Sequence, residues 1–282
     1  MHIQWYPGHM TKAKRQMQED MKLIDLVIEL VDARIPRSSR NPDIDELGKN
    51  KARLILLNKA DLANEACNEA WSTHFKERGF LVLKIDSRNR GNMKAVSALI
   101  AKAAEEKRER DRKRGILNRP VRAMVVGIPN VGKSTFINTY VGKAGAKVGN
   151  KPGVTKGKQW IRLNKGVELL DTPGILWPKF EDEIVGRNLA LIGSVKDEIL
   201  NREELALELL AFLKEKCAGE LSARYGIAEE QEPITLLFEI AKSRNCLKQG
   251  GAFDEEKATK LLLEEFRGGK LGRISLERPI QS

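Results

Sequence analysis

The feature that constrains this chain most is the stretch GIPNVGKST at positions 127–135. It follows the apolar run VRAMVV and precedes residues suited to a helix that begins at Lys133. The spacing of Gly127, Gly132, Lys133 and Ser134 satisfies G-x-x-x-x-G-K-[ST], the loop that joins a strand to a helix and binds phosphate. A chance glycine-rich turn is the alternative, but the flanking strand and helix are the context that the motif requires. The stretch therefore predicts an α/β sheet with a phosphate-binding loop at one strand end.

The residue types of this loop predict its chemistry. Glycines let backbone N–H groups turn toward phosphate oxygens at a helix N-terminus, where the helix dipole favours anions. We expect Lys133 to reach the terminal phosphates, as a candidate catalytic residue, and the Ser134 hydroxyl to hold Mg²⁺. The loop residues expected to contact the nucleotide are Gly127, Asn130, Val131, Gly132, Lys133, Ser134 and Thr135.

A second motif, DTPG, follows the apolar run VELL further along the chain. Asp171 ends this predicted strand and can face the metal ion, and the Gly174 N–H can meet the γ-phosphate. Thr155 lies between the two motifs and is the natural threonine to close over the metal. The alternative for Thr155 is an ordinary loop residue. The predicted metal ligands are Ser134, Thr155 and Asp171.

A third motif, NKAD, ends the apolar run RLILL well before the phosphate loop. The Asp61 carboxylate can accept hydrogen bonds from the ring N–H and the exocyclic amine of guanine, whereas adenine would leave it unpaired. Asn58 can bond the base edge or a neighbouring loop, and the Lys59 stem can cover the base plane. The next strand ends in IDSRNRG, which offers a second base-contacting loop through Asp86, Ser87 and Arg88.

The order of these motifs is the reverse of the usual one, in which the phosphate loop precedes the base reader. Either NKAD is an accident, or the chain is permuted around an unchanged site. Parallel strand ends meet at the carboxyl edge of a sheet in whatever order the chain visits them. A helix that ends in EEKRERDRKRGILNRP can supply the long connection between the two halves. The sequence therefore predicts a circularly permuted fold with an intact site.

The remaining pattern predicts two domains. An amphipathic helix from Thr11 leads into the strand LIDLVIELVDA, and further strands alternate with helices over roughly 64–78 and 91–110. RIPRSSRNPD reads as a loop, and NKG joins two strands as a hairpin-type turn. Only helical patterns follow Pro178. We expect a mostly parallel sheet covered on both faces in a domain spanning 1–178, with its N-terminal arm, and a smaller all-α domain spanning 179–282.

Charge divides the chain in the same place. Residues 1–179 carry 35 basic and 19 acidic side chains, whereas residues 180–282 carry 15 and 20. The segment 107–114 holds six basic residues, and 142–166 holds seven with no acidic one. This basic half is a candidate polyanion binder, although an ordinary solvated surface is the alternative.

Other sequence features bear on the cellular location. Three scattered cysteines form neither a CxxC pair nor a disulfide framework. The N-terminus lacks a secretory signal, and no run approaches the roughly 20 apolar residues that span a membrane. We therefore expect a cytoplasmic protein with no membrane partner.

Taken together, the motifs carry a specific resemblance. WYPGHMTKA, DARIPRSSRNP, NKADL, GIPNVGKST, PGVTKG, DTPGILWP and the helical tail, in this order, resemble the circularly permuted GTPases of ribosome assembly, the YlqF family. The resemblance covers nearly the whole chain. It implies a cytoplasmic GTPase that binds GTP and GDP, acts on the large ribosomal subunit and is monomeric away from it. It also implies a helical domain that contacts ribosomal RNA, through patches such as KSRNCLKQ or RGGKLGRISLERP.

Catalytic assistance is the part that the motifs define least. Ile175 stands after Gly174, where many GTPases have a glutamine that orients water, so we expect slow hydrolysis alone and faster hydrolysis on the ribosome. Asn130 resembles the asparagine by which some related GTPases hold K⁺; its alternative role is to brace the loop. His9 in YPGHM could polarise water, and its alternative is a surface or capping histidine.

Two other function classes remain open at this point. A P-loop ATPase or kinase would share the phosphate loop, but Asp61 argues against it. A passive RNA-binding scaffold would bind RNA equally in every nucleotide state. The segment after Asp171 also leads directly into the helical domain, which we expect to anchor it and respond to its movement; a constitutively packed tail is the alternative.

Overall fold

The computed structural model describes residues 9–116, 119–142, 159–164, 166–172, 176 and 182–279. Within them, six strands form one sheet in the order β3-β2-β1-β4-β6-β5. All neighbours are parallel except β5 and β6, which form an antiparallel hairpin. The strands are β1 (Leu26–Asp32), β2 (Ala52–Asn58), β3 (Leu81–Lys84), β4 (Val121–Val126), β5 (Gln159–Asn164) and β6 (Val167–Asp171). The predicted strands and the mostly parallel sheet are confirmed.

Helices cover both faces of this sheet. Met17 and Met21 of α1 pack with Val27 and Met124, and the aromatic residues of α3 pack on the same face beside Val31. The other face lies against α4 and α6. The described helices are α1 (His9–Met21), α2 (Pro42–Leu47), α3 (Glu65–Glu77), α4 (Gly91–Ala103), α5 (Glu105–Lys113), α6 (Lys133–Val141), α7 (Glu183–Leu191), α8 (Arg202–Lys216), α9 (Glu220–Tyr225), α10 (Pro233–Ser243) and α11 (Glu255–Arg267).

The strand sequences explain why these layers form. All seven residues of β1 are buried, because it lies between β2 and β4 and is covered on both faces. The helix α3 begins where the Asn64 side chain accepts from the Cys67 N–H, and α11 begins in the same way at Asp254. All three cysteines are free.

Two local predictions were wrong in detail. The expected helix over 91–110 is divided into α4 and α5 at Ala104, which is buried under the sheet. The expected loop ends earlier than predicted, because Asn41 caps a short helix, α2, that has Pro42 at its first position.

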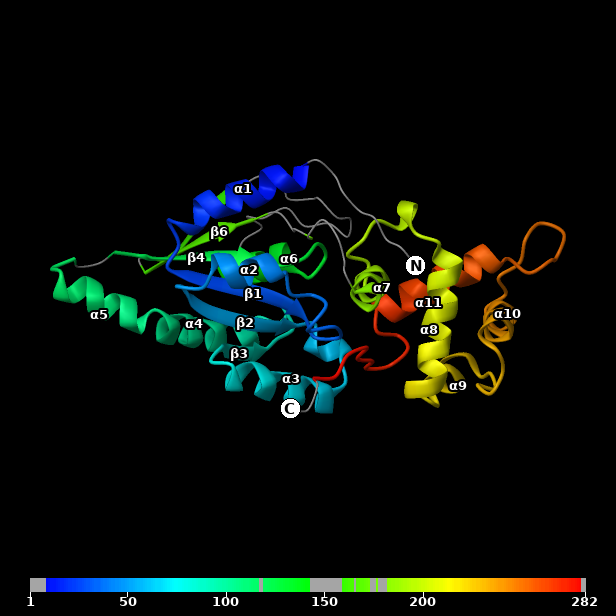
Figure 1. Cartoon of the computed structure of the whole chain (residues 1–282). Helices are drawn as coiled ribbons and strands as arrows, with labels where there is room; N and C mark the ends of the chain where they lie inside the picture. Colours follow the sequence, from blue (N-terminus) through cyan, green and yellow to red (C-terminus); the bar gives the residue numbers. More distant parts are fainter. Residues whose placement is uncertain are drawn as a thin grey trace.

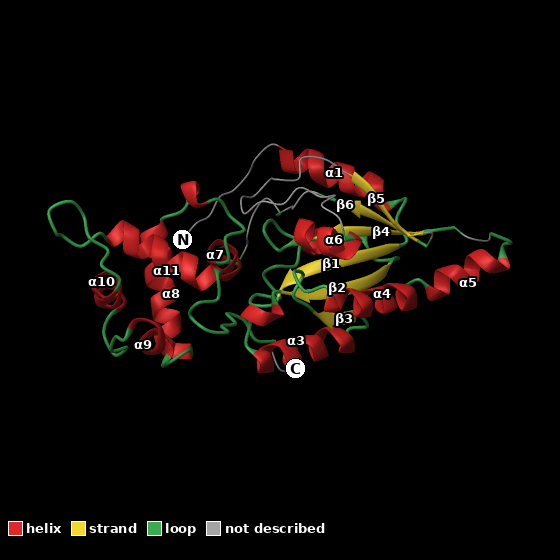
Figure 2. Ribbon diagram, turned by 180° about the vertical axis from the view of Figure 1, so that it is seen from behind, coloured by secondary structure: helices red, strands yellow, loops and turns green. Residues whose placement is uncertain are grey.

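The helices α7 to α11 gather beyond the carboxyl ends of the parallel strands, and α5 projects at the opposite end (Figures 1 and 2). One apolar core runs from the α4 face of the sheet into this helical group. No described helix is long and apolar enough to cross a membrane.

The segment 268–279 runs back from α11 to the side of the sheet where α3 lies (Figure 1). Its backbone is bonded to the loops that follow β1 and β2: the Ile274 N–H donates to the Leu62 carbonyl at 3.1 Å, and the Leu276 N–H donates to the Arg34 carbonyl at 2.9 Å. No sequence pattern predicts this return.

Candidate nucleotide-binding site

The phosphate loop joins β4 to α6, as the motif requires. Gly132 has φ 103° and directly precedes α6. A Cβ at this position would lie 2.5 Å from the Asn58 Nδ2, so only glycine permits the two segments to approach this closely. The loop thus has a backbone that can turn N–H groups toward an anion at the helix N-terminus.

Lys133 lies under this loop and is 7% exposed. Its Nζ donates to the carbonyls of Gly127 at 2.9 Å and Ile128 at 2.8 Å. Burial lowers the pKa of Lys133 to about 8, against the opposing charge of Asp171. The ammonium is therefore held at the loop, where it can exchange these carbonyls for phosphate oxygens.

Asp171 ends β6 beside the phosphate-loop strand, where it pairs with Val125 in register. Its Oδ1 is buried and has no hydrogen-bond partner among the described residues. Burial raises the pKa of Asp171 to about 6, although Lys133 opposes this. A buried carboxylate oxygen without a described partner, on the strand next to the phosphate-loop strand, fits the oxygen donors that Mg²⁺ prefers.

The early motif meets the phosphate loop directly. The Asn58 side chain is fully buried; its Nδ2 donates to the Val131 carbonyl at 2.7 Å, and its Oδ1 accepts from the Ser87 N–H at 2.9 Å. The Lys59 Nζ donates to the Asn130 carbonyl at 2.8 Å. Lys59 and Asn130 both have φ 58°, a left-handed conformation that these contacts hold. Three segments that are distant in the chain are therefore bonded at one sheet edge.

The carboxylate of Asp61, which the sequence predicts to read the base, already has a partner. Asp61 Oδ2 accepts from Arg88 Nη2 at 2.6 Å, and Arg88 Nε also donates to Asp86 at 2.9 Å. Ser87 is 4% exposed beneath them. The sequence pointed to Arg88 as a base contact, whereas the structure pairs it with Asp61. A guanine base can replace Arg88 as the partner of Asp61, because Arg88 retains its hydrogen bonds to Asp86.

The structure describes little or nothing of three predicted residues. Thr155 and Gly174 lie outside the described residues, and only the backbone of His9, the first residue of α1, is described. Thr135 lies in the first turn of α6, half-buried.

Comparison with known proteins decides the family. A family model described as "50S ribosome-binding GTPase" matches residues 122–237. Proteins named ribosome biogenesis GTPase A are 50% identical in Bacillus cereus, over 99% of this chain and 95% of that protein, and 36% identical in Thermotoga maritima, over 98% and 95%. The chain belongs to the ribosome biogenesis GTPase A family. It is therefore a GTPase that hydrolyses GTP.

Solved structures of that family agree with the fold. YlqF from T. maritima bound to GNP has a TM-score of 0.67 at 32% identity, and covers 96% of this chain and 100% of its own. A GDP-bound structure of the same protein has a TM-score of 0.68 at 30% identity, and covers 95% and 100%. The circularly permuted order of motifs predicted from the sequence is consistent with this ribosome biogenesis GTPase A family.

Sequence reasoning missed a group of residues behind the nucleotide site. Asp32 is fully buried and forms a bidentate pair with Arg34, at 2.9 and 2.8 Å, and an ion pair with Lys59 Nζ at 3.0 Å. Burial alone would raise the pKa of Asp32, but the charges of Arg34 and Lys59 hold it far below its usual range. The sequence pattern puts Asp32 at a predicted strand end and Arg34 at the start of a predicted loop, and it predicts no contact between them. Aspartate and arginine two residues apart at a strand end are too common to predict this pair.

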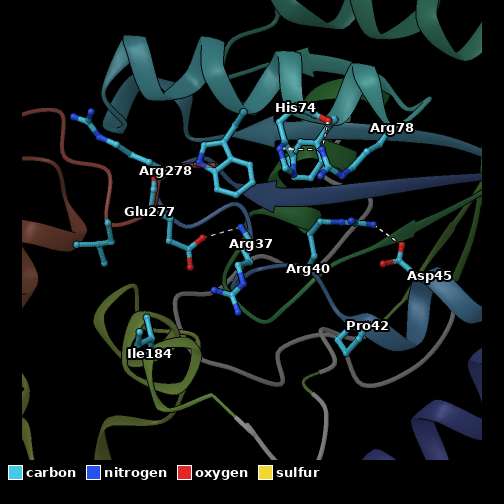
Figure 3. A pocket seen from close by; sticks show the side chains of 12 residues that line it. Arg37, Arg40, Pro42, Asp45, His74, Arg78, Ile184, Glu277 and Arg278 are labelled. Atoms are coloured by element: carbon cyan, nitrogen blue, oxygen red, sulfur yellow. Dashed lines mark hydrogen bonds and ion pairs between the residues drawn. The ribbon is translucent and has the colours of Figure 1, made fainter. Parts of the chain in front are cut away.

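The returning tail forms a second surface feature, an open groove of about 730 Å³ (Figure 3). The tail is fixed there because Glu277 accepts from the Arg37 N–H at 2.7 Å, and its carbonyl accepts from Trp71 Nε1 at 3.2 Å. Arginines from three segments surround the groove: Arg37 and Arg40 from the loop after β1, Arg78 after α3, and Arg278 from the tail.

These arginines differ in their partners. Arg40 is bonded to Glu29 and Asp45. Arg78 Nη1 lies 2.9 Å from the ring Nδ1 of His74 and donates to the His74 carbonyl at 3.1 Å. Neither Arg78 nor Arg278 forms an ion pair with a carboxylate in the part of the chain that the structure describes, and both are exposed. The groove thus presents two unneutralised guanidinium groups.

Proposed function

We propose that this GTPase is an assembly factor that acts on the large ribosomal subunit and binds ribosomal RNA more tightly with GTP than with GDP. The observation that carries the nucleotide part is the bonding of Asn58 and Lys59 to the phosphate loop, which unites a guanine reader with a phosphate site. The ribosomal part is supported by the description of the matching family model, and by basic surfaces on the described chain.

The proposal assigns the site residues the following roles. Lys133 and the backbone N–H groups of residues 127–135 bind the phosphates, and Asp61 reads the guanine edge. Asn58 joins the two segments, and the Lys59 stem lies along the base. The loop of Asp86, Ser87 and Arg88 completes the base pocket, and Gly174 meets the γ-phosphate.

Mg²⁺ is the cofactor that GTPases of this kind use, and Ser134, Asp171 and Thr155 are the proposed ligands. The ion supplies neutralisation of the phosphate charge. Asp171 is suited to this role because its Oδ1 is buried without a described partner. We also assign hydrolysis a slow basal rate, roughly 10⁻⁴ to 10⁻² per second, because Ile175 cannot orient water.

Two residues are proposed to assist hydrolysis. Asn130 could hold K⁺ against the phosphates, but its Nδ2 donates to the Gly193 carbonyl at 2.7 Å, which favours the bracing role. His9 remains a proposal from its motif. Hydrolysis rates that are equal in Na⁺ and K⁺ would show that Asn130 holds no K⁺ and only braces the phosphate loop.

The RNA contacts are proposed on two described surfaces. The helix α5 has no buried residue and carries Arg108, Arg110 and Arg112 in the open. The groove carries Arg78 and Arg278. By contrast, most of the predicted patch RGGKLGRISLERP is used within the molecule, because Arg267 and Arg273 bond backbone carbonyls and carboxylates.

Co-sedimentation with large ribosomal subunits tests the proposed function. We expect a larger bound fraction with a non-hydrolysable GTP analogue than with GDP, and GTP hydrolysis that is faster when subunits are added. Equal sedimentation in both nucleotides, with hydrolysis unaffected by subunits, would contradict the proposal and favour a passive role.

The groove can be tested through the salt dependence of RNA binding. Each phosphate contact contributes about 0.7 to 0.9 to the slope of log K against log salt. Replacing Arg78 and Arg278 by alanine should therefore lower the slope for large-subunit RNA by about 1.4 to 1.8. The control replaces Arg202 and Lys260 by alanine. These residues lie on helices of the acidic half, and their replacement removes the same charge. Equal slopes in both double variants would assign the effect to net charge and exclude the groove.

A further inference from the structure

A continuous set of contacts connects the loop after β2 and the phosphate loop to the helices α7 and α11. We call it the Arg34–Arg267 network; its residues are Asp32, Arg34, Lys59, Arg267, Gly193 and Ser194. It begins at Lys59, which is bonded to the Asn130 carbonyl on one side and to Asp32 on the other. Asp32 in turn is held by Arg34. Lys59 is thus bonded to a carboxylate that itself belongs to a fully buried ion pair.

Arg34 connects Asp32 to the helix α11 of the helical group. Its Nη1 donates to the backbone carbonyl of Arg267 at 3.2 Å, and its guanidinium lies 5.7 Å from the Phe266 ring centroid. The backbone carbonyl of Arg34 accepts from the Leu276 N–H. Arg34 is only 2% exposed. A side chain with so many fixed contacts cannot move unless the end of α11 moves with it.

Arg267 holds the end of α7. Its Nε donates to the Leu191 carbonyl at 3.0 Å, and its Nη2 donates to the Ala190 carbonyl at 2.9 Å. The guanidinium also forms a bidentate pair with Asp197, at 2.8 and 2.9 Å. A cation at the C-terminus of a helix is favoured by the helix dipole. Gly193, at φ 78°, lies against this group: a Cβ there would be 3.2 Å from the Arg267 Nε.

The turn after α7 closes the network on the phosphate loop. The Gly193 carbonyl accepts from Asn130 Nδ2 at 2.7 Å, and the buried Ser194 Oγ donates to the Pro129 carbonyl at 2.7 Å. Asn130 is therefore held at its carbonyl by Lys59 and at its side chain by Gly193. Both paths lead back to Arg267.

We propose that Arg267 is a positioning residue for nucleotide binding: its side chain fixes Pro129 and Asn130 of the phosphate loop through the α7 turn. Its backbone carbonyl in addition joins the end of α11 to Arg34, and hence to Asp32 and Lys59. The helical group then sets the affinity for guanine nucleotides without touching them. Conversely, a nucleotide that shifts the loop changes the α7–α11 junction. This inference rests on the proposed nucleotide site.

The test compares Arg267→Lys with a matched control. Lysine keeps the charge but loses the planar fork that bonds two carbonyls and Asp197 at once. The control is Arg224→Lys, because Arg224 also forms a bidentate pair, with Glu265 of α11, but lies outside the network. The dissociation constants for GDP and a GTP analogue are measured with Mg²⁺, together with thermal unfolding of the nucleotide-free proteins.

We expect Arg267→Lys to raise both dissociation constants about tenfold, and Arg224→Lys to leave them within twofold whatever its loss of thermal stability. Ser194→Ala, which removes only the bond to Pro129, should also weaken binding, and the double variant should lose less than the product of the two factors.

Three results would overturn the inference: an Arg267→Lys dissociation constant within twofold of the parent, an equal loss in Arg224→Lys, or, if Arg267→Lys fails to fold, unchanged binding in Ser194→Ala. Failure of the parent to bind GDP would instead contradict the nucleotide site itself.

Discussion

Replacing Arg34 by methionine should lower the free energy of unfolding by about 3 kcal/mol or more, because among the described residues it leaves the fully buried Asp32 with Lys59 as its one cationic partner. Methionine keeps the apolar stem of the side chain, so the loss reports the ion pair and the bond to the Arg267 carbonyl. Removing one member of a buried pair is costly since the other charge stays desolvated. Urea unfolding followed by circular dichroism measures the change.

The control for this variant is Arg122→Met. Arg122 forms an ion pair with Glu168 on adjacent strands, but its side chain is 39% exposed. Such a pair is screened by solvent and should contribute less than about 1 kcal/mol. A loss for Arg34→Met that is no larger than for Arg122→Met would show that Asp32 does not depend on Arg34.

Much of the sheet and the core of the site could be predicted from local signals. Apolar runs ending in GIPNVGKST, NKAD and DTPG mark strand ends, and parallel strands bring their carboxyl ends to one edge. That rule is enough to place Asn58 near Val131, although they are far apart in the chain. The start of α2 also has a local signal, because Asn41 can cap a helix and Pro42 suits its first position, although the prolines and serines of this segment favour a loop.

The contacts behind the site could not be predicted in this way. Arg34 lies in a segment whose prolines and serines indicate a surface loop, yet tail and α11 residues bury it. Glu277 and Leu276 have no periodicity that would direct them to α3 and the Arg34 carbonyl. Ion pairs such as Asp61 with Arg88 depend on side-chain geometry between two loops, which strand-end rules do not specify.

The substitution Asp61→Asn should change base specificity and leave the fold intact. Asparagine keeps one acceptor but turns the other position into an amide donor, which then faces the exocyclic amine of guanine. Xanthine carries a carbonyl there and becomes the better match. A lost charged hydrogen bond is worth about 1.5–3 kcal/mol, so GTP affinity should fall at least tenfold while xanthosine triphosphate affinity rises.

The structure refines the expected effect on stability. Asp61 is paired with Arg88, whose side chain is 65% exposed, so the variant loses a solvent-screened ion pair. Because Arg88 keeps its bonds to Asp86, we expect the unfolding temperature of the nucleotide-free variant to remain close to that of the parent. A large drop in that temperature would assign Asp61 a structural role.

Competition binding of GTP and xanthosine triphosphate to the parent and Asp61→Asn is the measurement that tests the central claim most directly. The claim is that NKAD and the phosphate loop form one guanine-nucleotide site despite their reversed order. It predicts that the parent prefers GTP and that the variant prefers xanthosine triphosphate. A variant that binds GTP as tightly as the parent would show that the early motif does not read the base.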